Sequence, residues 1–106
     1  MDSASALNAL KALAQERRLA AFRLLVQAGE SGMAVGDLRE ALDIPAATLT
    51  AHLNILRAAG LALDQRQGRV IRVRADYSRM NALQGFLTEN CCQGAVCETS
   101  TLCNES

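Results

Sequence analysis

The chain has 106 residues with 11 basic and 11 acidic side chains, so its formal net charge is zero. This length corresponds to one domain, and a hydrophobic content of 50% excludes disorder throughout the chain. No apolar run approaches the roughly 20 residues of a membrane span. The N-terminus lacks the basic start and apolar stretch of a secretory signal peptide. We therefore expect a cytoplasmic protein that contacts no membrane.

The charges are distributed unevenly along the chain. Residues 57–79 contain six arginines and two aspartates, whereas residues 80–106 contain no Lys or Arg. A basic segment between two segments that are not basic indicates a local contact with a polyanion rather than binding through bulk charge.

Apolar residues at helical spacing predict four helices in the first 59 residues, at about 5–14, 16–28, 35–42 and 45–59. Glycines stop the second helix, and Pro45 marks the start of the fourth because proline is tolerated there. The apolar stripes consist of Leu7, Leu10 and Leu13; Leu19, Phe22, Leu25 and Val26; Val35, Leu38 and Leu42; and Leu49, Leu53 and Leu56.

After Gly60 the apolar period changes from 3.6 to 2, which predicts a two-stranded hairpin with its turn at Gly68 and arginines on its outer face. Asp76 is the expected N-cap of a last helix that ends near Asn90. The stripe of that helix is Tyr77, Met80, Leu83 and Leu87. The fold class is therefore mainly α with a small β-hairpin, in a domain over residues 1–90, followed by a polar tail over residues 91–106.

A short helix, a tight turn, a second helix and a hairpin form a winged helix-turn-helix, whose second helix enters the DNA major groove. The outward side chains of helix 45–59 can hydrogen-bond to bases, and the hairpin arginines can bind phosphates or the minor groove. A solvated helix face is the alternative, but the adjacent arginines favour DNA. The predicted DNA contacts are Thr48, Thr50, Ala51, His52, Asn54, Arg57, Arg66, Arg69, Arg72 and Arg74.

Three segments, residues 13–19, 38–42 and 48–61, resemble the ArsR/SmtB repressors, and the last of these is the most specific. The resemblance spans about residues 7–90. It implies a homodimer that binds a palindromic operator, leaves it when metal binds, and dimerises through its first and last helices. We expect Leu83 and Leu87 to lie partly in that interface. The family often has Arg at the position of Ala51, a departure that affects the base preference.

The four cysteines all lie in the last 16 residues, at Cys91, Cys92, Cys97 and Cys103. In a cytoplasmic chain such a cluster indicates metal or redox chemistry. The family's commonest arsenic site needs cysteines at the start of the third helix, and residues 31–36 contain none. The family's zinc site on the last helix needs histidines, and the only histidine is His52. Both of these family sites are therefore absent.

We predict that Cys91, Cys92 and Cys97 bind trivalent arsenic, because thiolates are soft ligands and one chain can supply the three sulfurs of a pyramidal site. Some arsenic-responsive family members resemble this arrangement. The effector is arsenite, antimonite or a methylated trivalent arsenical, and Cys103 is auxiliary. A thiol redox switch and a zinc or cadmium site are the alternatives. We expect no enzyme activity, since a Cys-x-x-Cys motif is absent.

Overall fold

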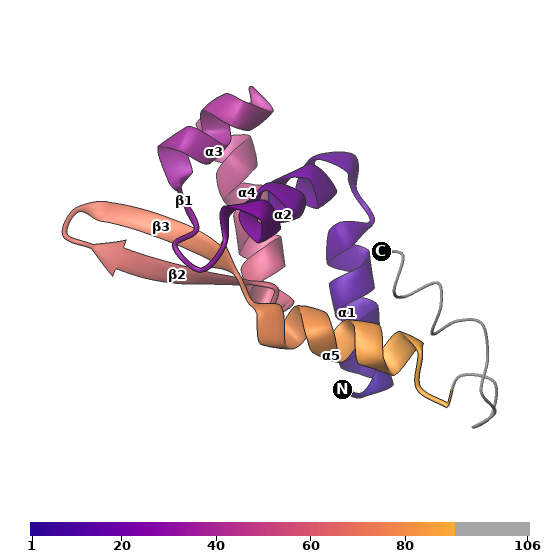
Figure 1. Cartoon of the computed structure of the whole chain (residues 1–106). Coiled ribbons are helices and arrows are strands. Elements are labelled where there is room, and N and C mark those ends of the chain that lie inside the picture. Colours follow the sequence, from indigo (N-terminus) through magenta and orange to yellow (C-terminus); the bar gives the residue numbers. More distant parts are fainter. Residues whose placement is uncertain (91–106) are drawn as a thin grey trace.

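The computed structural model describes residues 1–90, and the tail over residues 91–106 lies outside them. Figure 1 shows a hairpin that projects from one side of a group of helices, while the first and last helices lie together away from it. The elements are α1 (Ser3–Leu13), α2 (Glu16–Ala28), β1 (Met33–Ala34), α3 (Val35–Leu42), α4 (Ala46–Ala58), β2 (Ala62–Gln67), β3 (Val70–Ala75) and α5 (Tyr77–Leu87). This arrangement confirms the predicted winged helix-turn-helix.

The helix boundaries follow from local capping. The Asp76 side chain accepts a hydrogen bond from the Arg79 backbone N–H at 3.1 Å, which confirms the predicted cap of α5. Pro45 occupies the N-cap position of α4, and Gly60 follows that helix with φ +78°. Between α3 and α4, Asp43 adopts a left-handed conformation with φ 52°, which makes the turn tight. Helix α5 ends at Leu87, before the predicted Asn90.

The core is aliphatic, and α4 contributes the stripe that the sequence predicts. Leu49, Leu53 and Leu56 are at most 1% exposed. Residues from several other elements complete the core. They include Leu25, Leu38, Leu61 and Val73.

Helix α1 is buried through its alanines, and two leucines of its predicted apolar stripe lie at the surface. Its buried residues are Ala6, Ala9 and Ala12, whereas Leu7 and Leu10 are 54% and 38% exposed. Small side chains allow α1 to pack closely against α2, α4 and α5, and the leucines then lie on the neighbouring face.

Two apolar expectations need correction. Leu19 in α2 is 44% exposed, so it does not belong to the core stripe of Phe22 and Leu25. Leu83 in α5 is only 6% exposed and packs within its own chain, whereas Leu87 is 58% exposed. Of these two residues, only Leu87 is available to a partner.

The sheet has a third strand that the sequence analysis missed. Its order is β1-β3-β2 and all pairings are antiparallel, with Met33 opposite Val73. Two residues are too few to show an alternating pattern, so no local signal marks β1. In the hairpin, Leu63 and Ile71 are each 37% exposed. Leu63 pairs with Arg74, on the sheet face opposite to Val73, whereas Ile71 shares the Val73 face but lies closer to the end of the hairpin.

No helix among residues 1–90 combines the length and the apolar character that crossing a membrane requires.

Candidate nucleic-acid interface

The exposed side of α4 carries the small residues that were predicted to contact DNA. Thr48, Thr50 and Ala51 are exposed on the surface, opposite the buried leucines of the same helix. The Thr50 hydroxyl donates a hydrogen bond to the Ala46 carbonyl at 3.0 Å. Its lone pairs therefore remain available to accept hydrogen bonds from a base or from water.

His52 is placed differently from these neighbours, because its ring is half-buried. Its Nδ1 atom is buried and has no hydrogen-bond partner among the described residues. Partial burial, followed by the positive charges of Arg18 and Arg17, lowers the pKa of His52. The neutral form of the imidazole is therefore favoured. The ring lies on the side of α4 that is near the start of α2.

Asn54 and Arg57 belong to a network that connects α4 with the hairpin. Arg57 Nη1 donates to Asn54 Oδ1 at 2.9 Å, and Arg57 Nε donates to Asp64 Oδ1 at 2.9 Å. A guanidinium has only donors, so the amide atom that faces it is the oxygen, and the Asn54 amino group remains free to donate. An exposed ion pair of this kind contributes about 0–1 kcal/mol to stability.

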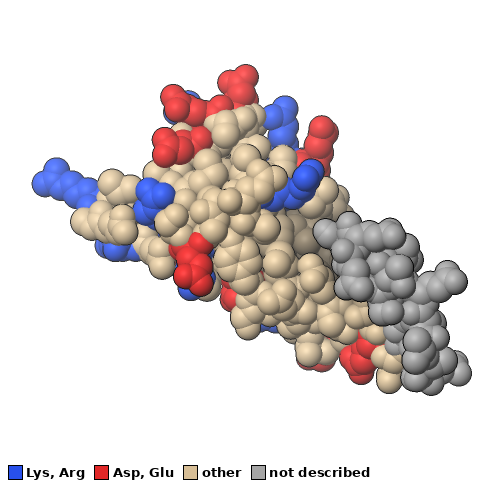
Figure 2. Space-filling model, viewed as in Figure 1, with Lys and Arg blue, Asp and Glu red and all other residues tan. Residues whose placement is uncertain are grey.

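The hairpin arginines fall into different environments. Arg66 in β2 and Arg69 in the turn are exposed, and Figure 2 shows positive side chains at the projecting end of the hairpin. Arg72 is half-buried, and its guanidinium donates to the carbonyls of Ser31 and Gly32. Arg74 is also half-buried, with an Nε atom that has no partner among the described residues.

Charge is also separated between the hairpin and the first helix of the helix-turn-helix pair. Figure 2 shows acidic side chains around α3. Asp37 and Glu40 lie in α3, and Asp43 follows it. A polyanion is therefore attracted to the hairpin and repelled from this part of the surface.

Two arginines that the sequence analysis missed hold the turn between α3 and α4. Arg17 Nη1 donates to the Leu42 carbonyl at 3.0 Å, and Arg39 Nε donates to the Ile44 carbonyl at 3.3 Å. Arg17 satisfies a carbonyl at the end of α3, so it connects α2 to the turn that precedes α4. No local pattern predicts a contact between residues 25 positions apart.

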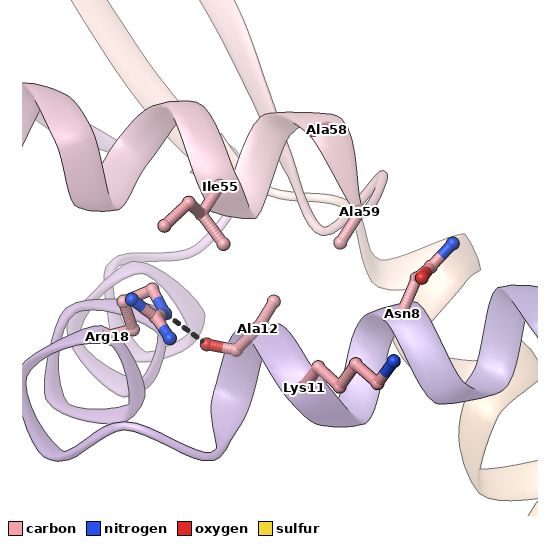
Figure 3. A pocket seen from close by; sticks show the side chains of 7 residues that line it. All are labelled: Asn8, Lys11, Ala12, Arg18, Ile55, Ala58 and Ala59. Carbon is pink, nitrogen blue, oxygen red and sulfur yellow. Dashed lines mark hydrogen bonds between the residues drawn. The ribbon is translucent and has the colours of Figure 1, made fainter.

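A pocket of about 410 Å³ lies between α1, α2 and the end of α4 (Figure 3). The lining residues are Asn8, Lys11, Ala12, Arg18, Ile55, Ala58 and Ala59. The Arg18 Nε atom donates to the Ala12 carbonyl at 2.7 Å, so this side chain closes the corner between α1 and α2. None of the predicted DNA contacts lines this pocket.

The predicted metalloid ligands Cys91, Cys92 and Cys97 lie outside the described residues, as does Cys103. Within residues 1–90, no group of three or more His, Cys, Asp or Glu side chains is arranged to hold a metal ion.

Comparison with known proteins places this geometry among bacterial regulators. A family model described as a helix-turn-helix domain matches residues 13–66, which is about half of the chain. The arsenical resistance operon repressor of Escherichia coli K12 is 42% identical over 64 residues, covering 60% of this chain and 53% of the relative. The transcriptional repressor SmtB of Mycobacterium tuberculosis is 38% identical over 78 residues, covering 73% and 54%. The aligned part thus spans about half the length of these two relatives.

A similar structure is the homodimeric winged helix-turn-helix DNA-binding domain of a transcriptional regulator from Mycobacterium bovis. The two chains share 29% identity with a TM-score of 0.64, and the match covers 81% of this chain and 80% of the other.

Proposed function

Because this chain belongs to the ArsR/SmtB family of helix-turn-helix transcriptional regulators, we propose that it represses transcription by binding a two-fold symmetric operator as a homodimer. We further propose that trivalent arsenic releases it from DNA by binding Cys91, Cys92 and Cys97. The observation that carries the proposal is the arrangement of α4, which is fixed in the core on one side and carries small polar residues on the other, next to an arginine-bearing hairpin.

The contacts of α4 support a role as the recognition helix. Thr48 and Thr50 lie in its first turns, and N-terminal residues of a recognition helix contact base edges. Thr50 offers lone pairs, whereas Asn54 offers an amino group, because Arg57 already occupies its oxygen. These groups suit different base edges in the major groove. Arg66 and Arg69 bind phosphates beside the groove.

The exposed leucines support homodimerisation. Leu7 and Leu10 on α1 and Leu87 on α5 are 54%, 38% and 58% exposed, and the two helices pack against each other. Burying three such side chains against their symmetry mates removes apolar surface from water. The homodimeric state of the Mycobacterium bovis domain supports the same assembly.

The choice of arsenic rests on the chemistry of the cysteines. One of the two relatives is named for arsenical resistance and the other is not, so family membership alone does not select the effector. Three thiolates within seven residues suit a trivalent, thiophilic ion, whereas zinc usually binds four ligands from spaced pairs. Cys91 is four residues after Leu87, the last residue of α5, so a ligand there is close along the chain to one of the proposed dimer helices. We propose that its binding changes the packing of these helices.

The experiment is a titration of the fully reduced protein with arsenite while its anisotropy on a fluorescent symmetric duplex, selected from a random pool, is measured. We expect release of the wild type and of Cys103→Ser. Cys91→Ser, Cys92→Ser and Cys97→Ser should bind DNA normally and resist arsenite.

The alternatives give different outcomes in the same assay. Release that requires peroxide, and not arsenite, would replace the proposal with the thiol redox switch. Release by zinc or cadmium alone would indicate a divalent metal site. X-ray absorption of the arsenic complex provides a direct check, because a shell of three sulfurs is expected and nitrogen or oxygen ligands would contradict the site.

A further inference from the structure

The guanidinium of Arg72, in the middle of β3, is bound to the turn that precedes β1. Its Nε donates to the Ser31 carbonyl at 2.9 Å, and its Nη2 donates to the Gly32 carbonyl at 3.0 Å. Two adjacent donors of one planar fork thus bind two consecutive carbonyls, 41 and 40 positions away in the sequence. A flexible ammonium cannot reproduce this paired geometry.

The backbone at Gly32 packs closely against the backbone of β3 at Val73. Gly32 has φ +65°, and a Cβ at this residue would lie 2.2 Å from the Val73 carbonyl oxygen. The ladder pairs Ala34 with Arg72, and α3 begins at the next residue, Val35. Arg72 therefore connects the hairpin to the segment that leads directly into the first helix of the helix-turn-helix pair.

Arg66 and Arg69 differ from Arg72 in this respect. Both side chains are exposed near the end of the hairpin, and neither makes a side-chain hydrogen bond or ion pair with another described residue. They can approach a phosphate without breaking an existing contact. Two of the five N–H donors of Arg72 are bound to the carbonyls, so the guanidinium is held against the turn and can move to a phosphate elsewhere only by losing both charge-assisted bonds.

We propose that Arg72 is a positioning residue that fixes the angle of the hairpin relative to the helix-turn-helix pair, and that it makes no phosphate contact. This inference rests on the proposed DNA-binding function and revises the role expected for Arg72 from the sequence. The phosphate contacts of the hairpin belong to Arg66 and Arg69. Arg72 acts on DNA indirectly, by presenting those two side chains at the correct distance from α4.

Substitution by lysine distinguishes a positioning role from a phosphate contact. Lysine keeps the positive charge but lacks the two parallel N–H donors that bind the Ser31 and Gly32 carbonyls. We expect Arg72→Lys to weaken operator binding roughly tenfold or more, because DNA binding must then order a hairpin that the paired hydrogen bonds to the charged guanidinium no longer hold in place. Ser31→Ala, the matched control, should leave binding unchanged, because the anchor uses the Ser31 backbone carbonyl.

The salt dependence of binding gives a second readout. Each lost phosphate contact reduces the slope of log K against log salt by about 0.9, so a substitution in both protomers reduces it by about 1.8. We expect this change for Arg69→Gln and an unchanged slope for Arg72→Gln. An Arg72→Lys variant that binds normally, together with a reduced slope for Arg72→Gln, would overturn the proposal.

A measurement on the wild type alone covers the case in which the Arg72 variants do not fold. In NMR spectra the Arg72 Nε–H should exchange slowly with solvent in the free protein and should keep its chemical shift when DNA is added. Rapid exchange in the free protein, or a large shift on DNA binding, would refute the anchor. If the wild type binds no DNA duplex, the proposed function fails, while slow exchange in the free protein still identifies the anchor.

Discussion

Helices α1 and α4 are similar in length and both are rich in alanine and leucine, but they bury opposite residue types. Helix α4 buries Leu49, Leu53 and Leu56 and exposes small polar residues. Helix α1 buries Ala6 and Ala9, with Ala12, and exposes its leucines. A helix that must stay fixed while its outer face contacts a ligand benefits from large buried anchors, whereas exposed leucines fit a protein partner.

The strongest test of this comparison removes an anchor of α4. Leu53 is 1% exposed, so Leu53→Ala deletes buried methyl groups and leaves a cavity, at a cost of about 2–5 kcal/mol in the free energy of unfolding. Urea denaturation at fixed protein concentration measures this loss. Ile55→Ala in the same helix is the control, because Ile55 is 41% exposed. Equal losses for the two variants would contradict the assigned orientation of α4.

The second test overfills the buried face of α1. Ala9 is 0% exposed, and Ala9→Leu should destabilise the protein by about 1–3 kcal/mol because the close packing of α1 has no space for a larger side chain. Ala4→Leu, at an exposed position of the same helix, should change stability little. A neutral or stabilising effect of Ala9→Leu in thermal unfolding would show that the alanine face is not tightly packed.

The third test concerns the exposed leucines. The double variant Leu7→Gln and Leu10→Gln should form monomers in sedimentation velocity and keep its helical circular dichroism, because surface substitutions change folding stability by only about 0.5 kcal/mol or less. Leu63→Gln and Ile71→Gln replace apolar residues on the hairpin, each 37% exposed, and should leave the dimer intact. If the hairpin variants formed monomers and the α1 variants stayed dimeric, the dimer interface would have to be assigned to the hairpin instead of α1.

The smallest effect is expected from His52, the half-buried residue of α4. Its pKa in the folded state is lowered from 6.5 by partial burial and by Arg18 and Arg17, so the unfolded chain binds more protons just below that pH. The free energy of unfolding should therefore decrease as the pH falls through about 6.5. His52→Gln should show a flatter dependence in urea denaturation between about pH 7.5 and 5.5. Parallel curves for the two proteins would exclude this contribution.

Much of the fold could be predicted from local sequence. Helix α2, helix α3, the leucine anchors of α4 and the Asp76 cap coincide with the prediction, because each depends on residues within a few positions of one another. The glycine after α4 is equally local, since only a left-handed residue continues the chain there.

The elements that carry the candidate site could be predicted from the sequence, but the contacts of its arginines could not. The sequence identified α4 and the hairpin, yet it did not show that Arg57 is paired with Asp64 or that Arg72 binds Ser31 and Gly32. An arginine in a sequence carries a charge, whereas its role depends on which acceptors the fold brings within about 3 Å.

The amino-acid sequence by itself determined the order of the five helices and of the two hairpin strands in residues 1–90, because periodicity, caps and turn glycines are short-range properties. Only the tertiary structure decided that α1 buries alanines, that Met33 and Ala34 form a third strand, and that Arg72 faces the turn before β1. These three features have a common physical reason. Each depends on the space and the hydrogen-bond acceptors supplied by residues distant in sequence, and the local pattern contains no information about them.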